Sequence, residues 1–223
     1  MATTLAVLML GSYLLGGIPF GLLIAKSKGV DIRSAGSGNI GATNVGRVLG
    51  KKWGLLVFAL DAAKGAAATT AASVIIHQRP AISVSQADYI WLGAGVCAVL
   101  GHIFPIYSGL KGGKGVATSL GAIFGVYPYL TWSALLGLGI WGLVVKASGY
   151  VSLASIVAAW SVPISFIVIS IVAGWRLGEH ILLIGLSIVL STFILIRHRA
   201  NLVRIRAGTE NKVGQRDSTS KNT

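Results

Sequence analysis

The sequence is poor in acidic residues and in cysteine. Aspartate and glutamate occur only six times among 223 residues, at positions 31, 61, 88, 179, 210 and 217. Positions this scattered do not form the acidic clusters with which metal-dependent phosphotransferases hold magnesium. The single cysteine, Cys97, lies in an apolar run and has no disulfide or metal-ligand partner in the chain. We therefore expect no bound metal.

Two common reaction templates are also missing. None of the four histidines is followed by an aspartate five positions later, which excludes the His-x4-Asp dyad of the common glycerolipid acyltransferases. The run K-G-G-K-G at 111–115 resembles a phosphate-binding loop. The nucleotide-binding template G-x-x-x-x-G-K-[ST], however, would need glycine at Ser108 and a hydroxyl side chain at Gly115. A nucleoside triphosphatase is therefore not expected.

Charged residues make up only 11% of the chain, whereas 54% of it is hydrophobic. Soluble domains average about 25% charged residues, so this composition indicates a protein whose solvent is the lipid bilayer. The first apolar run has no Lys or Arg before Leu5, and the nearest cations, Lys26 and Lys28, follow it. This order lacks the positive start of a cleavable signal peptide and predicts a first transmembrane helix with its N-terminus outside.

The length of one apolar run leaves the number of spans open. The runs fall at about 4–24, 53–76, 88–107, 115–145, 150–173 and 180–196. The fourth contains 31 uncharged residues, or about 46 Å of helix at about 1.5 Å per residue, against about 30 Å of hydrocarbon. The alternatives are one long span or two short helices broken near Tyr127-Pro128-Tyr129.

The distribution of positive charge decides between these alternatives. With the run broken, seven helices place sixteen cationic residues on one side, at positions 26, 28, 33, 47, 51, 52, 111, 114, 146, 197, 199, 204, 206, 212, 216 and 221. With one long span, the last seven of them would lie on the opposite side, against the positive-inside rule. The clustering of cations between apolar runs also argues against nucleic acid, which a net charge of +13 would otherwise suggest as a partner.

We therefore predict an all-α integral membrane protein with seven transmembrane helices, of which the fourth and fifth are short or broken. Its N-terminus would lie outside and its C-terminus in the cytoplasm. Residues 1–211 would form a single membrane domain with a site on its cytoplasmic side. Residues 212–223 are polar and lack periodicity, which predicts a disordered tail.

Polar, glycine-rich segments interrupt the apolar runs. Residues 37–47 read S-G-N-I-G-A-T-N-V-G-R and combine glycines with small hydrogen-bonding side chains and one arginine. Exposed backbone N–H groups and a guanidinium are suited to bind phosphate. A flexible loop that ends in a stop-transfer arginine is the alternative, and spacing alone does not separate the two. The candidate substrate-binding residues of this segment are Ser37, Gly38, Asn39, Thr43 and Arg47.

Residues 101–117 repeat this character in G-H-I-F-P-I-Y-S-G-L-K-G-G-K-G-V-A, and the repetition favours phosphate binding. Lys111 and Lys114, with the amides of Gly112 and Gly113, could cradle a phosphate monoester or anhydride without a metal. A position at the start of the next helix would add the positive end of the helix dipole.

A third segment, R-H-R-A-N-L-V-R-I-R-A-G-T-E at 197–210, follows the last apolar run. If the last helix continues through it, His198 and Asn201 share a face, with Arg204 or Arg206 one turn further along. Contact with anionic lipid would explain the arginines, but it explains His198 and Asn201 less well.

Several other polar side chains can be interpreted as functional or as structural. Asp61 and Lys64, three residues apart within the second span, would form an ion pair that either braces the site or only joins helices. We interpret His102 as structural. His77 and His180 fall on the opposite side of the membrane by the predicted topology and are interpreted as bystanders.

Together the three segments resemble, in order, those of the bacterial acyl-phosphate:glycerol-3-phosphate acyltransferase family of the PlsY type. The likeness runs from the first helix to about Glu210 and includes V-S-L-A-S at 151–155. The resemblance implies transfer of a fatty acyl group from acyl phosphate to the 1-hydroxyl of glycerol 3-phosphate, which gives lysophosphatidate and inorganic phosphate. Because an acyl phosphate is already a mixed anhydride, it implies no cofactor. It also implies a multi-pass protein of the bacterial cytoplasmic (inner) membrane that contacts membrane lipids.

The family's pattern also assigns roles to individual residues. The resemblance implies that Ser37, Arg47 and Lys114 bind phosphate. It also implies that Ser155, His198 and Asn201 lie at the reacting centre. The match at Ser155 leaves Ser152, one helical turn away, as an alternative.

The base that takes the proton of the attacking hydroxyl has two candidates. One is His198, and the other is a substrate phosphate, whose pKa lies near 6. We favour a mixed role in which His198 and Asn201 orient the glycerol while phosphate helps with the proton.

A transporter of a small organic phosphate is the alternative function, because a cationic, glycine-rich site between short or broken helices also suits a transporter. Against it, no internal repeat relates residues 1–110 to residues 111–223. Acyl-chain preference, oligomeric state and the docking of a soluble acyl-phosphate-producing enzyme on the basic face stay open.

Overall fold

The computed structural model describes residues 2–213, which form helices joined by turns and loops. The helices are α1 (Ala2–Gly17), α2 (Phe20–Ser27), α3 (Ala42–Leu49), α4 (Lys51–His77), α5 (Val84–Ile103), α6 (Val116–Phe124), α7 (Thr131–Ser148), α8 (Val151–Val172), α9 (Ile181–Arg197) and α10 (Arg199–Arg206), with 3-10 turns η1 (Ile106–Ser108) and η2 (Leu177–His180). This part of the chain contains no strand, which confirms the all-α prediction.

Six helical segments within residues 2–213 are long and apolar enough to cross a membrane. They are α1 with α2, α4, α5 with η1, α7, α8, and η2 with α9. α1 and α2 are separated at Ile18-Pro19, because proline lacks an amide hydrogen and disfavours the helical conformation in the residue before it. Six long helices support an integral membrane protein but do not confirm the predicted seven.

The difference lies in the apolar run that was predicted to break near Tyr127-Pro128-Tyr129. The break is confirmed, because α6 ends at Phe124 and α7 begins at Thr131. α6 has nine residues, so at about 1.5 Å per residue it is about 13 Å long and too short to cross the hydrocarbon by itself.

α6 packs against α4 and runs in the same direction. A Cβ atom on Gly121 would lie 1.8 Å from the backbone oxygen of Ala62, and one on Gly125 would lie 2.1 Å from Thr69 Oγ1. Only glycine permits backbones to approach this closely. The second half of α6 is therefore held beside the middle of the long helix α4.

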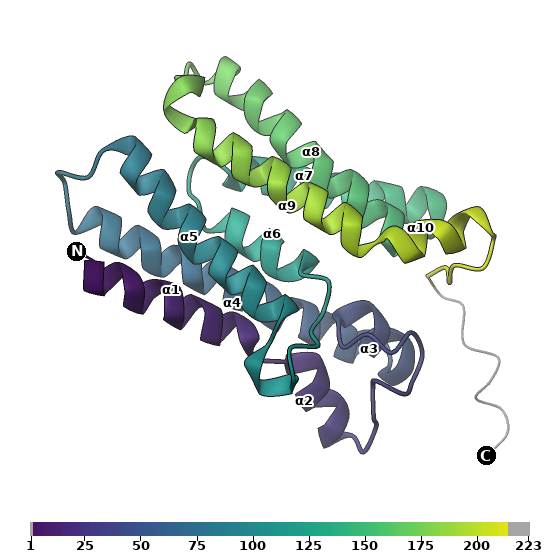
Figure 1. Cartoon of the computed structure of the whole chain (residues 1–223). Helices are drawn as coiled ribbons and strands as arrows, with labels where there is room; N and C mark the ends of the chain where they lie inside the picture. Colours follow the sequence, from purple (N-terminus) through teal and green to yellow (C-terminus); the bar gives the residue numbers. More distant parts are fainter. Residues whose placement is uncertain (1, 214–223) are drawn as a thin grey trace, which may run out of the picture.

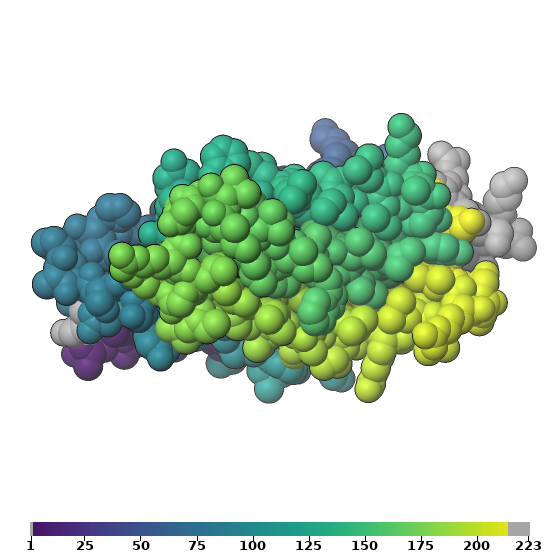
Figure 2. Space-filling model, turned by 90° about the horizontal axis from the view of Figure 1, so that it is seen from above, coloured from purple at the N-terminus to yellow at the C-terminus, as the bar shows by residue number. Residues whose placement is uncertain are grey.

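The helices form one elongated bundle whose described termini lie at opposite ends (Figure 1). Figure 2 shows the same body from above, again with the start of α1 at one end and the last described residues at the other. This separation is expected of a chain that passes along the bundle an odd number of times. The tail predicted from residue 212 lies, beyond Val213, outside the described residues.

The end that carries α3 and α10 is called the site end here, and it contains residues 28–52, 104–115, 149–150 and 198–213 (Figure 1). Hydrogen bonds join these segments. The Arg33 guanidinium donates to the backbone oxygens of Ser108 at 2.9 Å and Lys111 at 3.2 Å. The Val213 N–H donates to the Gly149 oxygen at 2.9 Å.

The opposite, far end contains residues 78–83, 125–130 and 173–180, and aromatic rings hold it together. The ring of Tyr129 lies 4.1 Å from that of His180 and 5.1 Å from that of Trp175, centroid to centroid. His180 Nδ1 lies 3.3 Å from Asp88 Oδ2, which joins the start of α9 to α5. The turn between α6 and α7 is thus placed at the far end.

Candidate active site

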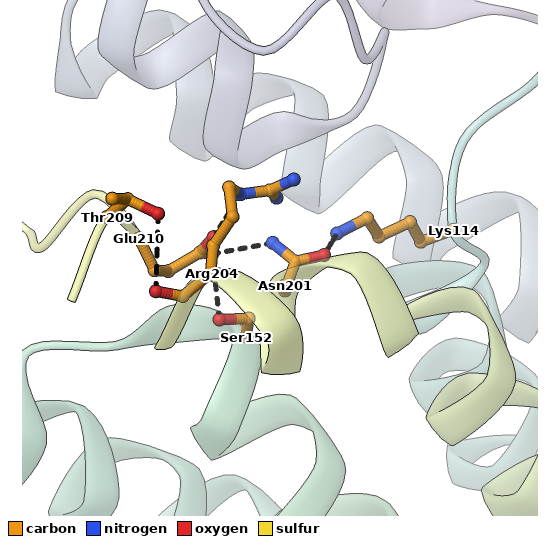
Figure 3. A network of polar contacts seen from close by, with 6 residues as sticks. All are labelled: Lys114, Ser152, Asn201, Arg204, Thr209 and Glu210. Carbon is orange, nitrogen blue, oxygen red and sulfur yellow. Dashed lines mark hydrogen bonds and ion pairs between the residues drawn. The ribbon is translucent and has the colours of Figure 1, made fainter. Parts of the chain in front are cut away.

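A polar network at the site end joins the loop before α6 to α8 and α10 (Figure 3). Lys114 Nζ donates to Asn201 Oδ1 across 87 positions of sequence, and Asn201 Nδ2 donates to Glu210 Oε1 at 2.5 Å. Ser152 Oγ donates to the same carboxylate oxygen at 2.9 Å. Arg204 Nε donates to Glu210 Oε2 at 2.7 Å. The structure therefore brings together two predicted site residues, Lys114 and Asn201.

Glu210 is the member of this network that the sequence prediction omitted. Burial alone would raise the pKa of Glu210, but hydrogen bonds from Asn201, Arg204 and Ser152 outweigh burial and lower it. The ionised carboxylate orients Asn201, whose amide nitrogen faces Glu210 and whose oxygen faces Lys114. The available signal was that Glu210 is the only acidic residue in the cationic segment 197–210.

Arg204 also belongs to this network, although lipid contact was one expectation for it. Its guanidinium bonds Glu210, and its backbone oxygen accepts the Thr209 hydroxyl at 3.4 Å. The residues that follow α10 are thereby folded back onto the helix, which puts Glu210 beside Asn201.

His198 lies between α9 and α10, three residues before Asn201, and its side chain is buried. Its Nδ1 donates to the backbone oxygen of Ile194 at 2.8 Å, because a carbonyl group can only accept. Burial, followed by the positive charge of Lys114, lowers the pKa of His198 to about 4. At neutral pH the imidazole is therefore uncharged, and Nε2 is its acceptor atom.

Lys114 is affected by several other positive charges at this end. Burial lowers the pKa of Lys114 to about 8; the charge of Glu210 opposes the shift, and Arg204, Arg197 and Arg47 add to it. Arg47 lies on α3, so the lysine of the second glycine-rich segment is affected by the charge of the arginine of the first. Within residues 2–213, the Arg47 guanidinium has no hydrogen-bond or ion-pair partner, so it is available to an anion.

Asn44 organises the loop that precedes α3. Its buried side chain accepts the Ser37 N–H at Oδ1, at 2.8 Å. Gly36 has a φ of +58°, and a Cβ atom there would lie 2.4 Å from Asn44 Oδ1. Asn39, a predicted substrate-binding residue, accepts the Gly41 N–H at 2.8 Å and so stabilises the loop in which it lies. The polar pattern of this segment is therefore partly a folding signal.

The remaining candidates of this segment lie at the surface of the site end. Ser37 and Thr43 are exposed, and Gly38 takes a left-handed conformation with a φ of +70°. Thr43 is four residues before Arg47 on α3, so the two share one face of the helix.

The glycine pair of the second segment has a different role from the one expected. The Gly112 N–H donates to the Ile103 oxygen at 3.1 Å, and the Gly113 N–H donates to the His102 oxygen at 3.2 Å. Both amides are thus already engaged, which corrects the expectation that they are available to phosphate. The Gly113 oxygen accepts from Arg197 at 3.1 Å, and Lys111 is exposed.

Ser155 does not join the polar network, whereas Ser152 does. The Ser155 hydroxyl donates to the Val151 oxygen at 2.8 Å and accepts from Trp141 Nε1 at 3.3 Å. This places Ser155 at the boundary between the network and an apolar cavity.

The apolar cavity, partly open to its surroundings, lies between α4, α6, α7, α8 and α9. Its lining is almost wholly apolar and includes Phe58, Leu120, Leu138, Trp141, Leu190 and Ile194. The backbone oxygen of Ile194, which lines the cavity, accepts the hydrogen bond of His198, so the cavity ends one helical turn from this residue. A cationic cluster beside an apolar cavity can hold a molecule with an anionic head and an apolar tail.

Known proteins are similar to this chain in sequence and in fold. A family model described as glycerol-3-phosphate acyltransferase matches residues 6–208. A curated glycerol-3-phosphate acyltransferase from Geotalea daltonii is 41% identical over 210 residues, which cover 94% of this chain and 97% of the relative. Another, from Aquifex aeolicus, is 42% identical over 212 residues, which cover 92% and 97%.

Two solved structures are also similar. Both are crystal structures of PlsY, described as an integral membrane glycerol 3-phosphate acyltransferase, and both are 40% identical over 95% of this chain and 96% of theirs. The glycerol 3-phosphate form has a TM-score of 0.80, and the lysophosphatidic acid form has a TM-score of 0.76.

Proposed function

The chain belongs to the glycerol-3-phosphate acyltransferase family, and we propose that it transfers a fatty acyl group from acyl phosphate to the 1-hydroxyl of glycerol 3-phosphate. The products are lysophosphatidate and inorganic phosphate. One observation supports acyl phosphate as the donor: the cationic network lies next to the apolar cavity, near Ser155 and Ile194. An acyl phosphate matches both parts, because its head is anionic and its tail is apolar.

Phosphate binding is assigned to Arg47 and Lys114, with Ser37 and Thr43 as neighbours on the first segment. Two arguments support this assignment. Arg47 is unpaired within the described residues, and Lys114 is the most strongly desolvated lysine of the site end, with a pKa lowered by burial to about 8. A bound phosphate would offset the repulsion among these cations, which gives the site a preference for a dianion.

The chemical step follows from the two substrates. The hydroxyl oxygen of glycerol 3-phosphate attacks the acyl carbonyl carbon, and the bond from that carbon to the phosphate oxygen breaks. Arg47 and Lys114 stabilise the charge that remains on the departing phosphate. Holding both substrates in one geometry can lower such a barrier by about 7–11 kcal/mol.

The hydroxyl proton goes to the departing phosphate in this proposal. A substrate phosphate group has a second pKa near 6, whereas burial lowers the pKa of His198 to about 4, so the phosphate is the stronger base. His198 Nε2 then accepts a hydrogen bond from the hydroxyl and orients it, with Asn201 positioned by Glu210 to bind the glycerol.

Incubation of the purified protein with acyl phosphate and radiolabelled glycerol 3-phosphate tests this function. Labelled lysophosphatidate and free phosphate should form in equal amounts, and acyl-coenzyme A in place of acyl phosphate should give no product. If the protein, reconstituted in vesicles, takes up the label without any acyl transfer, it is a transporter and not an acyltransferase.

The same proposal includes an orientation in the bacterial inner membrane. α6 with the turn at 125–130 makes the seventh pass, since it starts at the site end beside α4 and leads to Tyr129 at the far end. The site end would face the cytoplasm, because it carries most of the cations.

Cysteine labelling in intact cells tests the orientation. In a Cys97→Ser background, an impermeant maleimide should label Gln78→Cys and Gly178→Cys at the far end, and it should not label Lys52→Cys or Asn211→Cys at the site end. All four positions are exposed. Labelling at Asn211→Cys with protection at Lys52→Cys would restore the six-span alternative.

A further inference from the structure

A second group of polar side chains lies inside the bundle, outside the network of Figure 3. Asp61 and Lys64 on α4 and His102 on α5 are 3%, 2% and 6% exposed. Lys64 Nζ lies 2.8 Å from Asp61 Oδ1, and His102 Nδ1 lies 3.5 Å from the same oxygen. These three residues are called the buried triad below, and the proposed chemistry does not use them.

One side of the buried triad contacts the break between α1 and α2. Lys64 Nζ donates to the backbone oxygen of Ile18 at 2.9 Å, at the point where the helix is interrupted before Pro19. α2 leads from this break into the loop and helix that carry Ser37 and Arg47. The contact of Lys64 therefore fixes the start of the element that delivers the first glycine-rich segment.

The other side contacts the loop that carries Lys114. The backbone oxygen of His102 accepts the Gly113 N–H at 3.2 Å. A Cβ atom on Gly113 would lie 2.2 Å from His102 Nε2, so the imidazole rests directly on the backbone of this loop. Gly113 immediately precedes Lys114, and a movement of His102 would therefore move the lysine.

Ionisable groups within a membrane bundle carry a large desolvation penalty, and well-packed apolar residues usually join helices at a lower one. The contacts of the buried triad give a reason for its presence. We propose that Asp61, Lys64 and His102 are positioning residues that set the first glycine-rich segment against the second, and thereby the spacing of Arg47 and Lys114. This inference rests on the proposed function, because that spacing matters only if the two cations share a phosphate.

The test compares the buried triad with a matched pair at the far end. Asp61→Asn/Lys64→Met removes both charges together, so it leaves no uncompensated buried ion. It should lower kcat/KM for glycerol 3-phosphate at least tenfold while the protein stays monodisperse in detergent. Equilibrium dialysis of labelled glycerol 3-phosphate without acyl donor should show the same loss in affinity. Asp88→Asn/His180→Gln, which removes the buried pair of the far end, should keep both values within threefold.

His102 provides a second test that does not depend on the double variant folding. His102→Asn keeps a nitrogen that can donate to Asp61, whereas His102→Leu fills the space without a donor. The Leu variant should lose at least tenfold in kcat/KM, and the Asn variant should recover most of that loss.

Three results would overturn the proposal. The first is a folded Asp61→Asn/Lys64→Met variant with wild-type kcat/KM and affinity for glycerol 3-phosphate. The second is an equal loss of both values in Asp88→Asn/His180→Gln. The third is an equal loss of kcat/KM in His102→Asn and His102→Leu. Absence of acyl transfer by the wild-type protein would instead refute the proposed function itself.

Discussion

Lys114 and His198 lie in the same cationic cluster, and burial lowers the pKa of both, with opposite consequences for their charge. The pKa of Lys114 falls to about 8, so its ammonium group stays mostly protonated at neutral pH. The pKa of His198 falls to about 4, so its imidazole is neutral. One side chain can therefore hold an anion while the other accepts a hydrogen bond.

The pKa of Lys114 predicts a basic limb in the pH profile of the free enzyme. Lysine loses its proton as pH rises through about 8, so kcat/KM for glycerol 3-phosphate should decline above that value. Lys114→Arg should remove this limb, because arginine stays charged with a pKa above about 12, although its different shape should lower the rate at every pH. A limb that persists near the same pH in the variant would mean that another group titrates.

The pKa of His198 predicts that an acid limb near pH 6 belongs to phosphate. His198→Gln should keep that limb, since the glutamine amide still forms hydrogen bonds but cannot act as a base. It should also retain clearly more activity than His198→Ala. The pH profiles of both variants, with an NMR titration of the wild-type imidazole, check this. Two equally inactive variants and an imidazole that titrates with the acid limb would identify His198 as the base.

α6 helps to position the site, because Lys114 lies two residues before its first residue, Val116. Nine residues cannot hold a position in the membrane by themselves, so α6 relies on its close contact with α4. That contact requires glycine on α6, where the Cβ of any other residue would meet the backbone of its neighbour.

Gly121→Ala should therefore destabilise the protein. Its Cβ atom would lie 1.8 Å from the Ala62 oxygen, and overpacking of this kind reduces the free energy of unfolding by about 1–3 kcal/mol. Gly139→Ala on α7 is the matched control, because its Cβ atom would meet nothing within 4 Å. Thermal unfolding in detergent, followed by tryptophan fluorescence, should show a lower Tm for Gly121→Ala alone. Equal Tm values would show that the two backbones lie further apart.

The elements differ in how far the sequence alone determines them. The break between α6 and α7 was predictable, because 31 uncharged residues are too many for one span and the flanking cations require an added pass. The engagement of Gly112 and Gly113 was not, because it depends on how the loop folds back onto the end of α5. Glu210 was missed for a similar reason: it reaches Asn201 only through the turn after α10.

At the scale of the whole molecule, the site is assembled from segments spread along the chain. Arg47 comes from α3, Lys114 from the loop before α6, Ser152 from α8, and Asn201 and Glu210 from the C-terminal segment. A helical bundle has only two ends, so the sequence could predict which segments meet. It could not predict the atomic pairing among them, which depends on helix rotation and on the buried contacts between segments.

The assembly of Arg47 and Lys114 into one phosphate site is tested most directly by the acyl-transfer rates of three variants. Arg47→Ala and Lys114→Ala should each lower the rate at least about a hundredfold with an unchanged Tm, since a charge-assisted contact made mainly in the transition state contributes about 3 kcal/mol. Arg206→Ala, which removes an exposed cation from the same end, should stay within about threefold. Equal losses in all three variants would contradict a built site and leave only a general attraction of anionic substrates to the basic end.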